Sequence, residues 1–142
     1  MNDMTDIETM CQNVLDNPDF KPNELELALA CQSNFSFSFA LELGKVIPES
    51  LISEIVLNEG QNLSSIFEQE LNACQKEAFF MLCKIWSMLM LHFNKREDLV
   101  VSWLKRSKRP LSGQSPTKLM QSIAGGQAVL GIIERLNTGD FS

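Results

Sequence analysis

The sequence holds few side chains that could carry out chemistry. It contains one histidine and no tyrosine, and His92 lies between Leu91 and Phe93 at the end of an apolar segment. A structural histidine suits such a position, with a pH-sensitive or interface role as the alternative. Catalysis needs an acid, a base, a nucleophile or a metal that converge on one point. We therefore expect that the protein is not an enzyme and has no catalytic residues.

The cysteines predict neither a metal site nor a redox motif. Their separations match no C-x-x-C pattern, and one histidine with scattered cysteines cannot make a zinc site. We expect four small buried apolar side chains, with no metal and no cofactor. Free thiols without an export signal are typical of a cytoplasmic protein. The four are Cys11, Cys31, Cys74 and Cys83.

A basic cluster is the densest group of charges in the sequence. Lys105, Arg106, Lys108 and Arg109 place four cations in five positions directly before Pro110. Two interpretations remain open for the cluster. It is either a solvated loop or an electrostatic contact for an acidic partner or a phosphate.

Charge is divided unevenly along the chain. The net charge is −6, but residues 1–70 carry 13 acidic and 2 basic side chains, whereas residues 71–142 carry 5 acidic and 10 basic ones. The acidic half would repel a phosphate backbone, while the basic half could meet an acidic protein surface or nucleic acid. We expect DNA binding to be weak or absent, although charge alone leaves it uncertain.

Apolar periodicity predicts an all-α fold, a helical bundle with a small carboxy-terminal helical module. Residues 33–39 alternate as a strand would, but no second strand candidate is near, so helix is favoured there. The pair Gly125-Gly126 is expected to separate two helices, so it forms no phosphate-binding loop. The expected helices cover residues 4–16, a stretch opened by Pro22-Asn23, Pro48 to the Asn58-Glu59-Gly60 stop, residues 63 to about 93, residues 96–105, a short helix capped by Ser115-Pro116, and a last helix that ends between Asn137 and Gly139.

The longest of these segments, from Leu63 to about Phe93, is expected to be the spine of the fold. Its second half is apolar nearly all round, so it must be covered on several sides, either by its own domain or by a second copy. We expect a homodimer. Residues 78–91 are interrupted by Lys84 and are too short to span a bilayer, which needs about 20 residues, so no membrane segment is expected.

The carboxy-terminal third carries an ordered series of short motifs, each weak alone and specific together. The series resembles the toxin-binding domain of antitoxins of the Xre/MbcA/ParS type, over about residues 95–142. The motifs are Trp103-Leu104, the run from Pro110 through Gly113 and Ser115 to Pro116, Leu119-Met120, Gly126 to Leu130, Ile133 to Leu136, and Gly139-Asp140-Phe141-Ser142.

The resemblance implies a cytoplasmic bacterial antitoxin of a type II system, a helical homodimer that neutralises a cognate toxin. Such toxins consume NAD and are often RES-domain proteins with an ADP-ribosyltransferase-like fold. By position, the toxin-binding residues would be Arg135, Gly139, Asp140, Phe141 and Ser142. The residues that shape the loop and position the helices would be Pro110, Gly113, Ser115, Pro116 and Gly126, with Leu130 and Ile133 holding the last helix.

Elementary chemistry gives the last residues the same role. A glycine after a helix, then the aromatic Phe141 and a terminal carboxylate, would form a short tip that plugs a pocket and pairs with a cation. In the alternative, Phe141 folds back on its own core.

The sequence departs from the resemblance at several positions. A serine, Ser112, stands where a second loop glycine is usual, and Ser115 stands where threonine is usual. Ile123-Ala124 replaces an acidic residue before the last helix. We divide the chain into an acidic helical region, residues 1–60, and a helical toxin-binding domain, residues 61–142.

A DNA-binding transcriptional repressor is the rival hypothesis. Many relatives carry a helix-turn-helix before the toxin-binding domain, and residues 39–57 are the best candidate here, with Leu43-Gly44 starting the turn. The second helix would offer two carboxylates, Glu49 and Glu54, and no cation, so it would read a DNA groove poorly. A homodimeric scaffold without a toxin is a third hypothesis.

Overall fold

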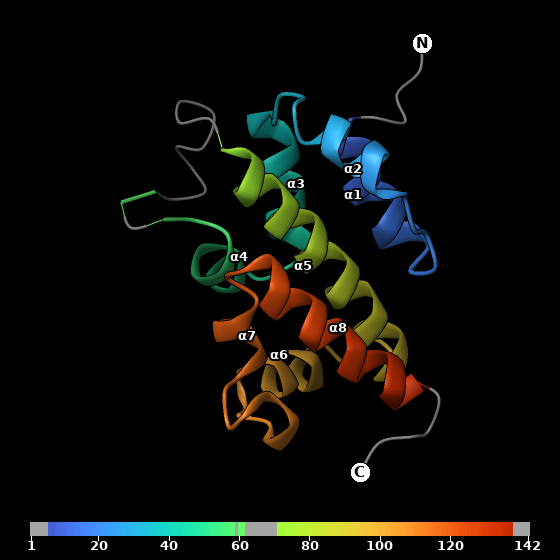
Figure 1. Ribbon diagram of the computed structural model, residues 1–142, viewed down its shortest axis with the longest axis vertical. Helices are drawn as coiled ribbons and strands as arrows, with labels where there is room; N and C mark the ends of the chain where they lie inside the picture. Colours follow the sequence, from blue (N-terminus) through green and yellow to red (C-terminus); the bar gives the residue numbers. More distant parts are fainter. Residues whose placement is uncertain (1–5, 59, 62–70, 138–142) are drawn as a thin grey trace.

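The chain is all-helical wherever its structure is described (Figure 1). The computed structural model describes residues 6–58, 60, 61 and 71–137, and within these ranges it contains eight α-helices, one 3₁₀ turn and no strand, which confirms the predicted fold class. The elements are α1 (Ile7–Asp16), α2 (Glu24–Ala30), α3 (Phe37–Val46), α4 (Glu49–Ile55), α5 (Ala73–His92), α6 (Glu97–Lys105), η3 (Arg109–Leu111), α7 (Pro116–Leu119) and α8 (Ile123–Asn137).

Helix α5 is the centre of the molecule (Figure 1). It packs against α1, α4, α6 and α8, and its largest side chains, Phe79 and Trp86, are buried. The cover that its all-round apolar surface requires therefore comes from its own chain. The predicted homodimer stays a prediction. None of the described helices combines the length and the apolar character needed to cross a membrane.

One hydrophobic core joins the two predicted regions of the chain. Buried residues from the first region, such as Ile7 and Leu51, belong to the same cluster as Leu82 and Ile133. Helix α8 lies along the second half of α5 and runs in the same direction, while α1 and α2 cover another side (Figure 1).

The start of α5 differs from the prediction. The helix was expected from Leu63, but Leu71 and Asn72 precede its first turn, and Ile66 and Phe67 lie outside the described residues. The Asn72 carboxamide oxygen accepts the Gln75 amide at 2.8 Å, and the Gln75 side chain accepts the Asn72 amide at 3.1 Å. This reciprocal pair satisfies two free amides at a helix start, so Asn72 begins a helix instead of continuing one.

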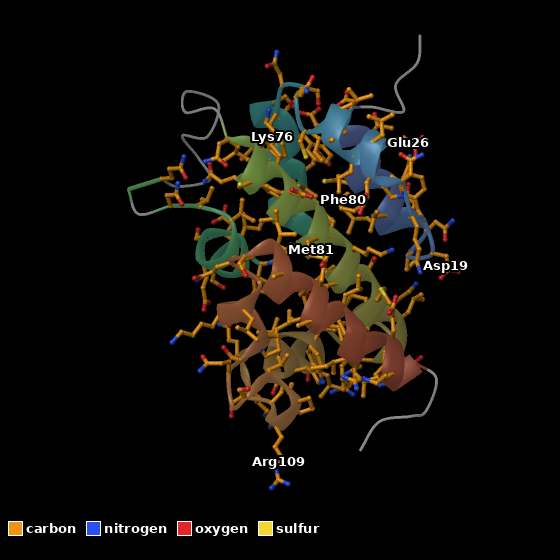
Figure 2. All side chains as sticks on the ribbon, in the orientation of Figure 1. Asp19, Glu26, Lys76, Phe80, Met81 and Arg109 are labelled. Carbon is orange, nitrogen blue, oxygen red and sulfur yellow. The ribbon has the colours of Figure 1, made fainter. Side chains whose placement is uncertain are left out.

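The predicted boundary at Gly125-Gly126 is wrong. Helix α8 begins at Ile123, and both glycines lie within its first turns. The Ser122 hydroxyl oxygen accepts the Gly125 amide at 3.0 Å and so starts the helix earlier. The glycines are needed for packing: a Cβ on Gly125 would stand 1.9 Å from the Leu119 carbonyl oxygen, and one on Gly126 would stand 2.9 Å from Cγ of Met81. Met81 lies where α8 meets α5 (Figure 2).

The predicted helix-turn-helix geometry is also wrong. Leu43-Gly44 forms no turn, because α3 continues through both residues to Val46, and the turn lies at Ile47-Pro48. Helix α4 then has only seven residues. The alternating segment, residues 33–39, does not form a strand. Residues 32–35 form a turn and loop, and Ser36 then caps α3 by accepting the Phe39 amide at 3.1 Å.

Two lysines on α5 are buried and hold the amino-terminal loops. Lys84 is 5% exposed, and its ammonium donates to the carbonyl oxygens of Pro18 at 3.2 Å and Phe20 at 3.0 Å. Lys76 is 8% exposed and donates to the carbonyl oxygen of Ser33. The loops that flank α2 are thus fixed to α5 by polar contacts as well as by apolar packing.

We expect the Lys84→Ala substitution to lower the free energy of unfolding by about 2 kcal/mol, because it removes two charge-assisted hydrogen bonds and a buried stem. Urea denaturation of the whole chain measures this. Lys45→Ala is the matched control, since Lys45 is exposed and makes only a surface ion pair with Glu42 at 3.8 Å. An equal decrease in the free energy of unfolding in both variants would show that the Lys84 contacts do not stabilise the fold.

The Lys84 contribution should also depend on pH. The pKa of the Lys84 ammonium lies below its usual 10.5, mainly because the group is buried and to a lesser extent because Lys21 repels it. Attraction from Glu134 and Asp19 offsets only part of this lowering. The unfolded chain therefore binds more protons than the folded chain in the window below pH 10.5. Between neutral pH and 10.5, the unfolding free energy of the natural chain should rise relative to that of Lys84→Ala. Parallel urea titrations over this range test the sign, and a falling difference would contradict it.

Candidate functional site

The motifs in the carboxy-terminal third fold into one packed unit, which we call the module, residues 97–137. It consists of α6, η3, α7 and α8, and it lies against α5. Its interior is continuous with the main core. The buried apolar residues of the module are Val100, Leu104, Leu111, Met120, Val129, Ile132 and Ile133.

The loop between η3 and α7 takes a conformation that normally requires glycine. Gly113 has a φ of 79°, and Ser112 has a φ of 57° and a ψ of 36°, so two consecutive residues are left-handed. The Gly113 amide donates to the Lys108 carbonyl oxygen at 2.9 Å, and the Lys108 amide donates to the Gln114 carbonyl oxygen at 2.9 Å. Ser112, where the resemblance expects a glycine, adopts the glycine-like conformation at a steric cost of about 1 kcal/mol.

The loop leads directly into a capped helix. Ser115 accepts the Lys118 amide at 3.4 Å, and Pro116 is the first residue of α7, as the sequence predicts. Pro116 and Thr117 are buried, and the Ser115 and Thr117 hydroxyls are 3.2 Å apart. The helix start is therefore fixed by side chains and by packing at once.

The basic cluster is mostly solvated. Helix α6 ends at Lys105, and Lys105, Arg106 and Arg109 are exposed. Figure 2 shows Arg109 pointing away from the ribbon at the end of the molecule opposite Lys76. Lys108 differs, because it is half-buried with its ammonium 4.5 Å from the centre of the Trp103 ring. Burial and then repulsion from Arg106 lower the pKa of Lys108.

The other predicted binding residues stand at the far end of α8. Gly126 is buried near the start of this helix, and the exposed Arg135 lies nine residues later, about 14 Å along the axis. Helix α8 is described to Asn137. The four tip residues, Gly139, Asp140, Phe141 and Ser142, lie outside the described residues, so the structure brings together the loop residues and leaves the tip as a prediction.

The cysteines and the histidine behave less uniformly than predicted. Cys11, Cys31 and Cys83 are buried, but Cys74 is exposed, because it follows the Asn72 cap on the outer side of the first turn of α5. Burial raises the pKa of the Cys31 thiol to about 11, and a hydrogen bond with Cys83 raises that of Cys11. His92 is exposed at the last position of α5, where its ring meets Phe93 edge-on at 4.9 Å.

Two surface hollows lie outside the predicted site. One, of about 400 Å³, has a polar lining from α4 and the start of α5 that includes Glu54, Cys74 and Gln75. The other, of about 470 Å³, is mainly apolar and is lined by Val46 and Leu91 among others. Neither contains a residue predicted to bind the toxin. Among residues 6–58, 60, 61 and 71–137, no three His, Cys, Asp or Glu side chains are grouped so as to hold a metal ion.

The sequence did not single out the solvent face of α6 or the two buried lysines of α5. The spacing of Leu99, Trp103 and Arg106, four and three residues apart, could have indicated a shared helix face on α6. For Lys76 and Lys84 the pattern gave no indication, since their carbonyl partners come from loops 43 to 66 residues away in the chain.

Two glycines of α8 should respond to alanine in opposite ways. We expect Gly125→Ala to lower the free energy of unfolding by about 2 kcal/mol or more, because the new Cβ would displace the Leu119 backbone. Gly131→Ala, with no atom within 4 Å of its added Cβ, should stabilise the chain by about 1 kcal/mol through helix propensity. Urea denaturation of both variants measures the contrast, and equal stabilities would contradict the close packing at Gly125.

Comparison with known proteins adds no relative: no protein-family model matches the chain, and neither does any of the curated proteins.

Proposed function

We propose that the chain is the antitoxin of a type II toxin–antitoxin system and that it inhibits a cognate NAD-consuming toxin by binding it. The module would be the binding part. Inhibition would be steric, with residues 137–142 occluding the active site of the toxin and Phe141 as the anchor. Bacterial origin, a cytoplasmic location and a homodimer belong to the same proposal.

The observation that carries the proposal is the local structure of the motif residues. Gly113 takes a positive φ, Ser115 and Pro116 start α7, and Gly126 permits the close contact of α8 with α5. These are positions at which the resemblance expects residues that shape the loop and position the helices, so their local structure supports the proposal.

The arrangement of α8 fits the proposed mechanism. Its buried face, which includes Val129, Ile132 and Ile133, fixes it to the core up to its last turn. The segment that follows Asn137 is therefore attached to a rigid support. Rigid presentation lowers the entropy lost on binding and so favours a short plug.

The structure favours this function over DNA-binding repression. On α4, the exposed side chains are Glu49, Ser50, Ser53 and Glu54, which present two carboxylates and no cation. A helix of seven residues with this surface would repel phosphates. A gel shift on the promoter of the protein's own gene, with a salt series, distinguishes the two functions: a sequence-specific shift by the chain alone would favour the repressor.

Co-expression with the toxin gene next to the antitoxin gene tests the tip mechanism. We expect deletion of residues 139–142 to abolish neutralisation, and Phe141→Ala to raise the dissociation rate of the complex about tenfold or more, as the loss of an aromatic anchor does. Growth rescue and surface plasmon resonance measure the two effects.

Leu25→Ala is the control for the loss of an exposed apolar side chain outside the module, because Leu25 is 68% exposed on α2. Intact neutralisation and binding after the deletion would show that the tip mechanism is wrong. Failure of the natural chain to bind the toxin would remove the proposed function itself.

A further inference from the structure

Helix α6 carries a surface that the core does not use. Val100 and Leu104 are buried, whereas Leu99 and Trp103, each one residue earlier and so about 100° round the helix, lie on its flank. Leu99 is 38% exposed, and Trp103 is half-buried with part of its ring packed against the core. Leu99, Trp103 and Arg106 follow one another at spacings of four and three residues, so they lie along one face of the helix. We call this stripe, together with Lys108 and Arg109, the α6 surface.

The cations of the α6 surface are not balanced by carboxylates. The ion pairs among the described residues use other cations: Lys21 with Glu134, Lys45 with Glu42, and Arg96 with Asp98. Arg106 and Arg109 make no ion pair or side-chain hydrogen bond with the part of the chain that is described, and neither does the neighbouring Lys105.

The dipole of α6 accounts for only part of this charge. A cation in the last turn of a helix interacts favourably with the free carbonyl groups there, which explains Lys105 and Arg106. Arg109 lies three residues beyond Arg106, in η3, and points away from the molecule (Figure 2). Arg109 is exposed and has no ion-pair partner among the described residues, so it is available to pair with a carboxylate of another protein.

We propose that the α6 surface docks on an acidic patch of the partner protein, outside the site that the carboxy-terminal tip blocks. This inference rests on the proposed function and adds a second contact to it. The partner patch would consist of carboxylates around a shallow apolar depression. The carboxylates would pair with Arg106 and Arg109, and the depression would receive Leu99.

The composition of the surface favours a protein over nucleic acid. Lys108 covers the Trp103 ring at 4.5 Å, so that face of the indole is not free to stack on a base. Leu99 would gain nothing from a phosphate backbone, whereas tryptophan and arginine are enriched at protein interfaces. The acidic amino-terminal half would also repel a polyanion over distances of about 10 Å.

Exposed cations of this kind mainly accelerate association. Rim charges change the association rate constant and its salt dependence, while buried apolar anchors change the dissociation rate constant. The α6 surface should therefore steer the toxin toward the module before the tip engages. The two contacts can be separated, because they affect different rate constants.

Association kinetics of the full-length chain with a catalytically inactive form of the neighbouring toxin, over a salt series, test the proposal. We expect the double variant Arg106→Glu/Arg109→Glu to lower the association rate constant about tenfold and to reduce its salt dependence. The matched control is Lys45→Glu/Lys95→Glu, which changes the total charge equally at exposed lysines outside the module. It should leave the association rate constant within about twofold of that of the natural chain.

Two further variants distinguish the effect of the charges from the effect of the apolar anchor and from a loss of folding. Arg106→Gln/Arg109→Gln should give an intermediate association rate constant with an unchanged melting temperature. Leu99→Ala should raise the dissociation rate constant about threefold, whereas Leu25→Ala on α2 should not.

Each outcome has a distinct meaning. Toxin-binding kinetics that are unchanged in all three module variants, or changed equally in the control pair, would overturn the α6 surface and leave the proposed function standing. An absence of toxin binding by the natural chain would overturn both. If the natural chain binds labelled duplex DNA at moderate salt and Arg106→Glu/Arg109→Glu does not, the α6 surface would be a nucleic-acid surface instead.

Discussion

The fold depends on covering a helix that is apolar on almost every side. Helix α5 cannot remain in water, because burial of side chains such as Phe79, Trp86 and Leu89 is the main favourable contribution to the stability of this chain. The surrounding helices each supply part of the cover. α1 and α4 come from the acidic half and α6 and α8 from the basic half, so the two halves share one support in spite of their opposite charge.

The same constraint explains where the binding surfaces lie. Once its cover is complete, α5 contributes little to the surface, and the elements that face solvent are those on the outside of the bundle. The module is one of these elements. Its loop, cap and glycine contacts fix the backbone, while the outward-facing residues of α6 and the end of α8 are left free to vary in chemistry.

The sequence predicted those features that arise from local interactions. Ser115 followed by Pro116 is a local signal for a helix start. The apolar spacing from Val129 to Leu136 indicates the part of α8 that follows the two glycines. Positions determined by distant contacts were missed. The glycines at 125 and 126 look like a break, but the Ser122 hydroxyl starts the helix before them, and they are glycine because α7 and α5 leave no room for a side chain.

Errors at Leu71, Leu43-Gly44 and Cys74 have related causes. Apolar periodicity continued through Leu71, yet the reciprocal hydrogen bonds of Asn72 and Gln75 start a new helix there. Gly44 looked like a turn, but glycine is tolerated in a helix when the neighbouring residues pack, as Leu43 and Ile47 do. Cys74 was expected inside because of its residue type, whereas its place in the first turn of α5 turns it outward. For the candidate site, the loop and cap residues were predictable from sequence, while the pairing of Lys108 with Trp103 required the structure.

The contacts of Lys84 also bear on how the chain is made. Its partners, Pro18 and Phe20, precede it by 66 and 64 residues. On the ribosome, α1 emerges long before α5, and α2 covers only a small part of it, so the main surface on which α1 packs is missing until α5 has left the exit tunnel. Until α5 has emerged, the nascent chain therefore carries an incompletely covered apolar helix, a stage at which chaperones and proteases compete for it.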